Sequence, residues 1–224
     1  MLNYQGLAGG LATTKLQRSR AIPRVRKLVF MDTYRARNAR SVELTERQFS
    51  IAVGSLLGDG YLVPTTRGYA LRINHSIAQK PHVDWKYKEL ELFTNTPPRQ
   101  SSSCYYFRTV SHHQFDQLRE AFYCGQRKIA PLRLSDWINP LVLSVWIMDD
   151  GAREGNQLRI NTQSFSQEEN ESFIEILKAK LGITATLNRD KDRFRLRVNA
   201  ASMLNVQQMV APYIVPSMHY KFSL

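Results

Sequence analysis

The sequence predicts an α+β fold made of two similar halves, each with the element order αββαββα or close to it. Three landmarks repeat along the chain of 224 residues and carry this prediction. An apolar segment ends in Asp-Gly at 59–60 and again at 150–151, and the triplet Arg-Ile-Asn occurs at 72–74 and at 159–161. The helix expected after each triplet recurs at a similar distance. A repeat period of about 90 residues indicates an internal duplication.

The first half begins at a helix-start signal. Thr45 and Gln48 stand at the N-cap and N3 positions of a capping box, so we expect a buried helix that stops at Gly60. Two strands follow at 61–63 and 69–74, around a turn that contains proline and glycine. The remaining elements are a helix over 80–93, a strand over 105–110 and a helix over 113–123.

The second half starts again with a helix over 140–151 that ends in Asp-Gly. Its other elements are a strand over 157–162, a helix over 167–180, strands over 183–188 and 193–199, and a helix over 201–210. We therefore divide the chain into a basic N-terminal extension at 1–41, a first half at 42–135 and a second half at 136–224. Two copies of one unit usually pack about a pseudo-two-fold axis, and the apolar Asp-Gly helices are the expected interface.

The charge of the chain indicates its partner. A formal net charge of +12 is typical of proteins that bind a polyanion, most often nucleic acid. Nine of the 31 basic residues, but one of the 19 acidic residues, lie in the extension at 1–41. This extension is open to three interpretations, namely a DNA-binding arm, an organelle transit peptide or a segment without a role.

Composition also excludes several classes of protein. No apolar run approaches the roughly 20 residues needed to span a bilayer, so we expect no membrane partner. Two cysteines, Cys104 and Cys124, are too few for a disulfide scaffold or a zinc module with four closely spaced ligands. No secretory signal is found, and we expect an intracellular protein of the bacterial cytoplasm, a mitochondrion or a chloroplast. The five histidines show no metal-ligand spacing, and we expect each to be a core or solvated side chain.

Asp59 and Asp150 are the candidate metal ligands. Each stands at the C-terminal end of an apolar helix, where the helix dipole disfavours a carboxylate, and side-by-side packing brings the two charges together. A bound Mg²⁺ relieves this repulsion, because Mg²⁺ prefers carboxylate, carbonyl and water oxygens, and it can activate water for attack on a phosphodiester. Asp149 is an alternative ligand, but alignment by the following glycine favours Asp150. For either copy alone, an ordinary Asp-Gly turn is the competing interpretation.

A candidate nucleic-acid surface follows from the strand predicted at 193–199. Arg193, Arg195 and Arg197 alternate there with apolar residues, which places the guanidinium groups on one face of the sheet and the apolar side chains on the other. Such a face suits phosphates and base edges, and the alternative is a solvated face without a ligand. The same polar inventory continues on other predicted strands at Arg72, Asn74, Arg159, Asn161 and Gln163.

Two lysines, Lys128 and Lys221, follow the last helix of each half. A lysine near the paired acids can polarise a water molecule or screen the charge that develops on a phosphate. The alternative is a surface lysine, and the sequence favours neither interpretation.

The two helix-end segments, AVGSLLGDG at 52–60 and LSVWIMDDG at 143–151, resemble the two motifs of LAGLIDADG homing endonucleases. The segments NTQSF at 161–165 and PSMHYK at 216–221 are similar to the single-chain branch that carries two motifs. This resemblance covers residues 45–224. It implies a monomer whose halves pack through the motif helices and whose antiparallel sheets form saddles in the major groove of double-stranded DNA.

The resemblance also implies an activity, a site-specific and metal-dependent cut of both DNA strands at a long asymmetric target that leaves 3′ overhangs. The implied ligands of Mg²⁺ or Mn²⁺ are Asp59, Asp150, Gly58 and Asp149, the last two through main-chain carbonyls. Lys128 and Lys221 match the basic positions that support the nucleophilic water. Two other functions remain open on the same fold, an intron RNA maturase and a DNA-binding regulator that does not cleave. The retained acids favour the nuclease.

Overall fold

A computed structural model describes residues 33–222 of the chain. The predicted extension at 1–41 lies largely outside these residues. Its described part forms helix α1 (Tyr34–Arg40), which is capped by the side chain of Thr33. Ala36 and Ala39 of this helix are buried in the hydrophobic core. The end of the extension is therefore packed against the first half.

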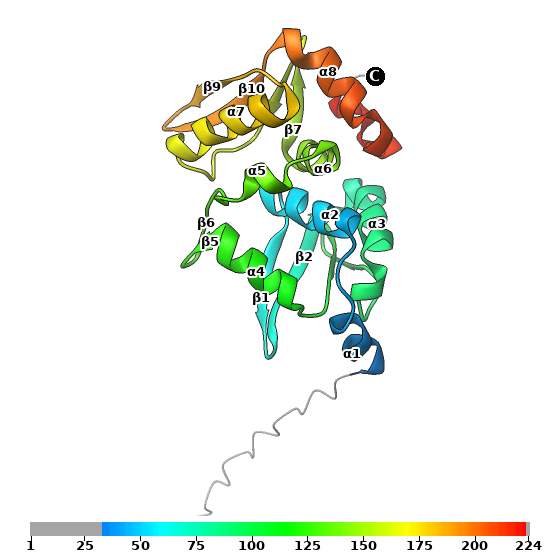
Figure 1. The fold of residues 1–224 in the computed structure, drawn as a ribbon. Coiled ribbons are helices and arrows are strands. Elements are labelled where there is room, and N and C mark those ends of the chain that lie inside the picture. The colour runs from blue at the N-terminus through cyan, green and yellow to red at the C-terminus, as the bar shows by residue number, and fades with distance from the viewer. Residues whose placement is uncertain (1–32, 223–224) are drawn as a thin grey trace, which may run out of the picture. The chain divides into compact units, whose positions relative to one another are not determined.

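The first half has the predicted order αββαββα (Figure 1). Its elements are α2 (Glu46–Leu57), β1 (Tyr61–Thr65), β2 (Gly68–Ser76), α3 (Lys80–Glu89), β3 (Arg99–Ser101), β4 (Cys104–Arg108) and α4 (His113–Phe122). The strands form an antiparallel sheet in the order β1-β2-β4-β3. A hairpin of β5 (Tyr123–Cys124) and β6 (Arg127–Lys128) and the short helix α5 (Leu134–Trp137) then lead into the second half.

The second half repeats both the element order and the strand order. Its elements are α6 (Pro140–Asp150), β7 (Gly151–Glu154), β8 (Gln157–Ile160), α7 (Gln167–Leu181), β9 (Ala185–Asp190), β10 (Arg193–Val198) and α8 (Ala200–Val210). The antiparallel sheet runs β7-β8-β10-β9, the same order as in the first half. Two 3₁₀ segments, Ala211–Tyr213 and Pro216–Lys221, follow α8. The expected α+β fold with two αββαββα halves and antiparallel sheets is confirmed.

The first motif helix starts as predicted but ends earlier. Thr45 accepts a hydrogen bond from the backbone N–H of Gln48, and the Gln48 side chain accepts one from the Thr45 N–H at 3.0 Å, so the capping box is present. The prediction that the helix runs to Gly60 is wrong, because α2 ends at Leu57 with Gly58 as its C-cap. A Cβ at Gly58 would lie 2.5 Å from the Cβ of Asp149, so this turn is shaped by the neighbouring helix.

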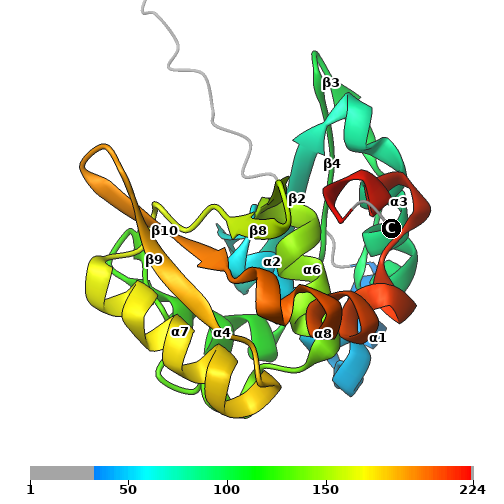
Figure 2. The same ribbon diagram turned by 90° about the horizontal axis from the view of Figure 1, so that it is seen from above.

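Helices α2 and α6 lie side by side and form the seam between the halves (Figure 2). Residues 50–57 and 141–149 are all buried, as expected for helices covered on every side. A Cβ at Gly54 would lie 2.7 Å from the carbonyl oxygen of Val142 and from the Cβ of Val145, so only glycine allows this approach. The bulky Trp146 packs against Phe173 of the second half, at 5.2 Å between ring centroids.

Each sheet has one face in the core and one polar face. Leu71, Ile73 and Phe107 are buried in the first half, where α3 and α4 pack against the sheet. Ile160, Leu196 and other inward residues are buried in the second, where α7 packs on β9 and β10. Arginines lie on the opposite faces, as the alternation on the strands requires. None of the helices within residues 33–222 is long and apolar enough to cross a membrane.

Candidate functional site

The two candidate ligands lie at the ends of the seam helices. Asp150 is the last residue of α6, and Asp59 follows the Gly58 cap of α2. Burial is the main cause that raises the pKa of Asp150 to about 8, and the charges of Asp59 and Asp149 raise it further. Lys128 and Lys221 oppose this shift. The fold therefore brings the helix-end acids of both halves, and a lysine from each half, into one electrostatic environment.

Both lysines hold main-chain carbonyls of the two motifs. The Nζ of Lys128 donates to the carbonyl oxygens of Gly58 and Gly60, at 2.9 Å each. The Nζ of Lys221 is buried and donates to the carbonyl oxygen of Asp149 at 2.7 Å. Burial lowers the pKa of each lysine, while the nearby aspartates act in the opposite direction. The lysines thus brace the backbone on either side of the acids, and they bond to the two carbonyls that the resemblance assigned to the metal.

The donor set fits a hard divalent cation. Asp59 and Asp150 offer carboxylate oxygens, and the carbonyls of Gly58 and Asp149 lie next to them in the chain. Burial and, after it, the surrounding carboxylates disfavour deprotonation of Asp150, and a cation bound between the acids would offset this penalty. Mg²⁺ or Mn²⁺ therefore suits these residues.

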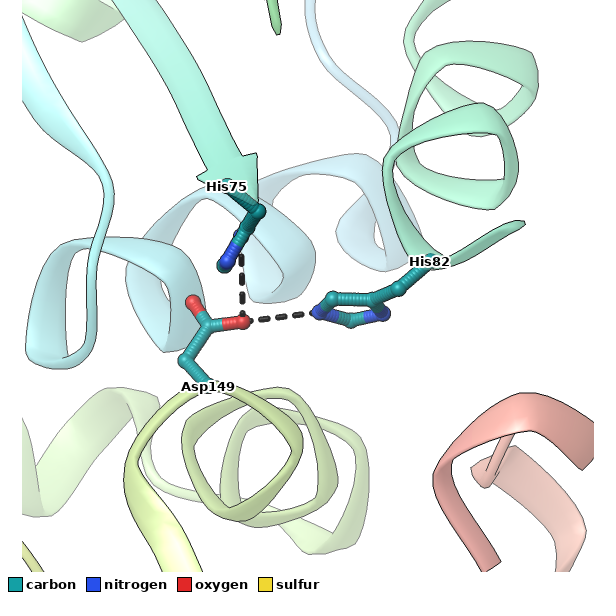
Figure 3. A group of neighbouring side chains, drawn as sticks. All are labelled: His75, His82 and Asp149. Atoms are coloured by element: carbon teal, nitrogen blue, oxygen red, sulfur yellow. Dashed lines mark hydrogen bonds and ion pairs between the residues drawn. The ribbon is translucent and has the colours of Figure 1, made fainter. Parts of the chain in front are cut away.

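The side chain of Asp149 does not lie with those of Asp59 and Asp150. It belongs to a buried cluster whose other members come from the first half. Lys86 Nζ lies 2.7 and 2.8 Å from its two carboxylate oxygens, and His82 Nε2 lies 2.8 Å from Oδ1. His75 Nε2 lies 3.6 Å from the same oxygen. Figure 3 shows the histidines converging on this carboxylate from strand β2 and the start of α3. We call these four residues the Asp149 cluster.

Electrostatics keep the Asp149 cluster paired. Burial by itself would raise the pKa of Asp149, but Lys86, the hydrogen bond from His82 and the charge of His75 hold it well below the usual range. Burial, followed by the charge of Lys86, lowers the pKa of His82 to about 4. Asp149 is therefore an ionised partner of Lys86 while His82 is neutral at pH 7. Because its carboxylate is engaged here, Asp150 is the better candidate for the metal, as the glycine alignment indicates.

The Asp149 cluster was not predicted from the sequence. The ligand atoms of His75, His82 and Asp149 lie within 4.8 Å of one another, a spacing suited to a metal, but the Lys86 ammonium already pairs with both oxygens of the carboxylate. The histidines are core side chains, as expected, but they are not separate from one another. His75 occupies an inward position of β2, and His82 and Lys86 share one face of α3. These positions could have predicted a group of buried polar side chains.

The polar face of the second sheet carries the predicted arginines together with acids that the prediction missed. Arg159 and Arg197 are opposite each other in β8 and β10, and both pair with Glu154, at 3.3 and 3.0 Å. Asp190 pairs with Arg195 at 3.4 Å and accepts a hydrogen bond from Gln163 at 2.9 Å. Arg193 is exposed near the end of the hairpin, and Asn161 follows β8. The arginines share one face of the sheet, as the alternation predicts, but two carboxylates that were not predicted pair with three of them.

The polar face of the first sheet differs. Arg72 of β2 lies directly opposite Arg108 of β4 in the sheet. Its guanidinium group lies over the ring of Tyr106, 4.4 Å from the ring centroid. Asn74 is opposite Tyr106 on the same face. Within residues 33–222, no carboxylate forms an ion pair with Arg72 or Arg108. Among the described residues, the first sheet thus presents two arginines, Arg72 and Arg108, without an acidic partner.

Residues 49–206, which include most of α2, all of α6 and both sheets, match the model of the LAGLIDADG DNA endonuclease family. The chain belongs to this family. Among LAGLIDADG relatives, cytochrome b mRNA maturase bI2 of Saccharomyces cerevisiae is 28% identical over an alignment of 198 residues, and the match covers 77% of this chain and 46% of that protein. A probable intron-encoded DNA endonuclease 3 of Mycosarcoma maydis is 29% identical over 124 residues, 52% of this chain and 91% of that protein.

A solved LAGLIDADG structure shares the fold. The homing endonuclease I-WcaI, bound to its DNA recognition sequence, superimposes with a TM-score of 0.75 at 23% identity, over 83% of this chain and 91% of that chain. The chain spans about half the length of the curated maturases that it matches. LAGLIDADG relatives of the chain thus include proteins named as endonucleases and proteins named as maturases.

Proposed function

We propose that the chain is a site-specific, divalent-metal-dependent endonuclease that cuts both strands of DNA. The observation that carries this proposal is the meeting of Asp59 and Asp150 at adjacent helix ends, with Lys128 and Lys221 beside them. Mg²⁺ or Mn²⁺ held by the two carboxylates would supply an activated water and would neutralise charge on the scissile phosphate. The two lysines hold the motif backbones in place and favour negative charge on the reacting groups.

The two polar sheet faces are the proposed DNA-binding surface. Arginine and asparagine side chains on strands can contact phosphates and base edges in the major groove. We assign this role to Arg72, Asn74, Arg159, Asn161, Gln163, Arg193, Arg195 and Arg197. The sheets lie in separate halves with different side chains, so they would read the two sides of an asymmetric target. We also propose that the halves at 42–135 and 136–224 act together within one monomer, and that the products carry 3′ overhangs.

Cleavage of a plasmid library tests this function. The library carries randomised inserts and the sequences that flank the gene for this chain, and the cut ends are sequenced after incubation with Mg²⁺. We expect discrete double-strand cuts with 3′ overhangs, and no cuts when Ca²⁺ replaces Mg²⁺. A library known to contain the flanking junction that stays uncut in both Mg²⁺ and Mn²⁺ would contradict the proposal.

The named maturase relative favours one second function, assistance to the splicing of an intron RNA. The match to that protein extends over 198 residues and so includes both halves. Binding of the intron transcript that surrounds the gene, measured against an unrelated transcript of equal length, tests this function. Equal affinity for the two transcripts at 150 mM salt would count against it, since phosphate contacts alone give no preference. The two functions can coexist, because the acids of a nuclease centre are not required for RNA binding.

A further inference from the structure

His75 lies between the carboxylates of the two motifs. Its side chain is almost fully buried, its Nδ1 lies 3.4 Å from Oδ2 of Asp59, and its Nε2 lies 3.6 Å from Oδ1 of Asp149. The two aspartates come from different halves of the chain. A single imidazole ring therefore faces a half-exposed carboxylate on one side and a buried, ionised carboxylate on the other.

We propose that His75 is a positioning residue that orients the Asp59 carboxylate for the divalent cation. This inference rests on the proposed function. Asp59 benefits from such a partner, because it lies beyond the end of α2 between two glycines and its side chain is about half exposed, at 49%. Lys128 donates to the carbonyls on both sides of Asp59, and the ring of His75 faces its carboxylate at 3.4 Å. Backbone and carboxylate are thus anchored separately.

The position of His75 is itself well determined. His75 points inward from β2, and the centroid of its ring lies 5.2 Å from that of His82. Its Nε2 faces the carboxylate of Asp149, which is bound by Lys86 and His82. Groups that orient metal-binding carboxylates in this way change metal affinity when they are replaced, often by 10- to 100-fold. Because Asp149 belongs to the second half, the same contacts tie the orientation of Asp59 to correct docking of the two halves.

The test is metal binding by the His75→Gln variant, in which the ring is replaced by an amide of similar reach. Mn²⁺ binding to the protein on its DNA target is measured by electron paramagnetic resonance, with DNA affinity measured separately in Ca²⁺. We expect roughly tenfold weaker Mn²⁺ binding, unchanged DNA affinity, and a cleavage rate that recovers when Mg²⁺ is raised about tenfold. His112→Asn is the matched control, because His112 is also buried but caps α4 and bonds Val42, away from Asp59.

The outcomes separate this inference from the proposed function. Mn²⁺ affinity of His75→Gln equal to that of the wild type, or lowered equally in His112→Asn, would overturn the positioning role. Loss of Mn²⁺ binding in Asp59→Asn alongside such a result would leave the proposed function intact. Mn²⁺ binding that persists in both Asp59→Asn and Asp150→Asn would overturn the metal site itself.

A measurement on the wild type covers the case in which His75→Gln does not fold. Long-range ¹H–¹⁵N spectra of the imidazole rings are recorded on the DNA complex before and after addition of Mg²⁺. The imidazole signals of His75 should change in chemical shift on addition of the metal, while those of His112 should not. An unchanged His75 ring would contradict the inference.

Discussion

The two halves of the molecule share an element order and a strand order but differ in the chemistry they contribute. The first half supplies the half-exposed Asp59 and a sheet whose arginines have no acidic partner among the described residues. The second half supplies the more buried Asp150 and a sheet whose arginines pair with Glu154 and Asp190. His75, His82 and Lys86 come from the first half and hold Asp149 of the second.

The repeated backbone and the chemistry of the site therefore depend on different features of the sequence. The αββαββα repeat fixes where the helix ends and the sheet faces lie, since those positions follow from the path of the chain. The surroundings of each acid and each arginine depend on side chains that have diverged between the copies. The two acids are therefore unequal, and we expect the two sheets to bind DNA with different electrostatics.

The strongest test of this asymmetry removes the lysine of the Asp149 cluster. Lys86→Met leaves a buried carboxylate without its ammonium partner, so we expect the free energy of unfolding to fall by about 3–5 kcal/mol. Urea unfolding measures this change. Lys88→Met on the exposed face of the same helix is the control and should change stability by less than about 0.5 kcal/mol. Adding Asp149→Asn to Lys86→Met should recover part of the loss, and a double variant less stable than Lys86→Met would contradict the pairing.

A second test uses the raised pKa of Asp150, which lies at about 8 against an ordinary value of 3.8. Between these values the folded chain keeps a proton that the unfolded chain has released, so the stability of the metal-free protein should fall as pH rises through this window. One proton contributes a slope of at most about 1.4 kcal/mol per pH unit. Urea unfolding in EDTA from pH 5 to 8 should show this slope in the wild type and a smaller one in Asp150→Asn. Parallel curves for the two proteins would contradict the assignment.

The smallest expected effect concerns the two sheets. Glu154→Gln frees Arg159 and Arg197 from their common acid, so we expect about threefold tighter binding to unrelated duplex DNA and a salt dependence steeper by about one phosphate contact. Fluorescence anisotropy over a salt series measures both quantities. Glu171→Gln on the exposed surface of α7 is the control of equal charge change. The same gain in the control would show that net charge, and not the sheet face, is responsible.

Much of the fold could be predicted because its signals are local. The capping box at Thr45 and the alternation of Arg193 to Val198 each lie within a few residues, and the two Asp-Gly segments indicated the repeat. The short strands at 99–101 and 151–154 were not predicted. The predicted end of α2 was too far along the chain. The conformation at Gly58 depends on its close contact with Asp149 across the seam. Local sequence carries no information on such a contact.

The candidate site divides in the same way. Asp59, Asp150, Lys128 and Lys221 could be proposed from the sequence because the repeat places them at matched positions. The Asp149 cluster was missed because its partners lie 63 to 74 positions earlier in the chain and meet Asp149 only through the docking of the halves. Glu154 and Asp190 were missed for a related reason, since the pairing of neighbouring strands brings these acids to the arginines.

The central claim is that Asp59 and Asp150 form one metal-dependent nuclease centre across the seam. Strand-resolved cleavage of the target found in the library tests it directly, with wild type, Asp59→Asn and Asp150→Asn compared. Binding assays in Ca²⁺ first set the protein concentrations at which all three occupy the DNA equally. We expect each variant to bind the target with affinity within about threefold of wild type and to lose double-strand cleavage by at least about 100-fold. Cutting of both strands at the wild-type rate by either variant would contradict the account.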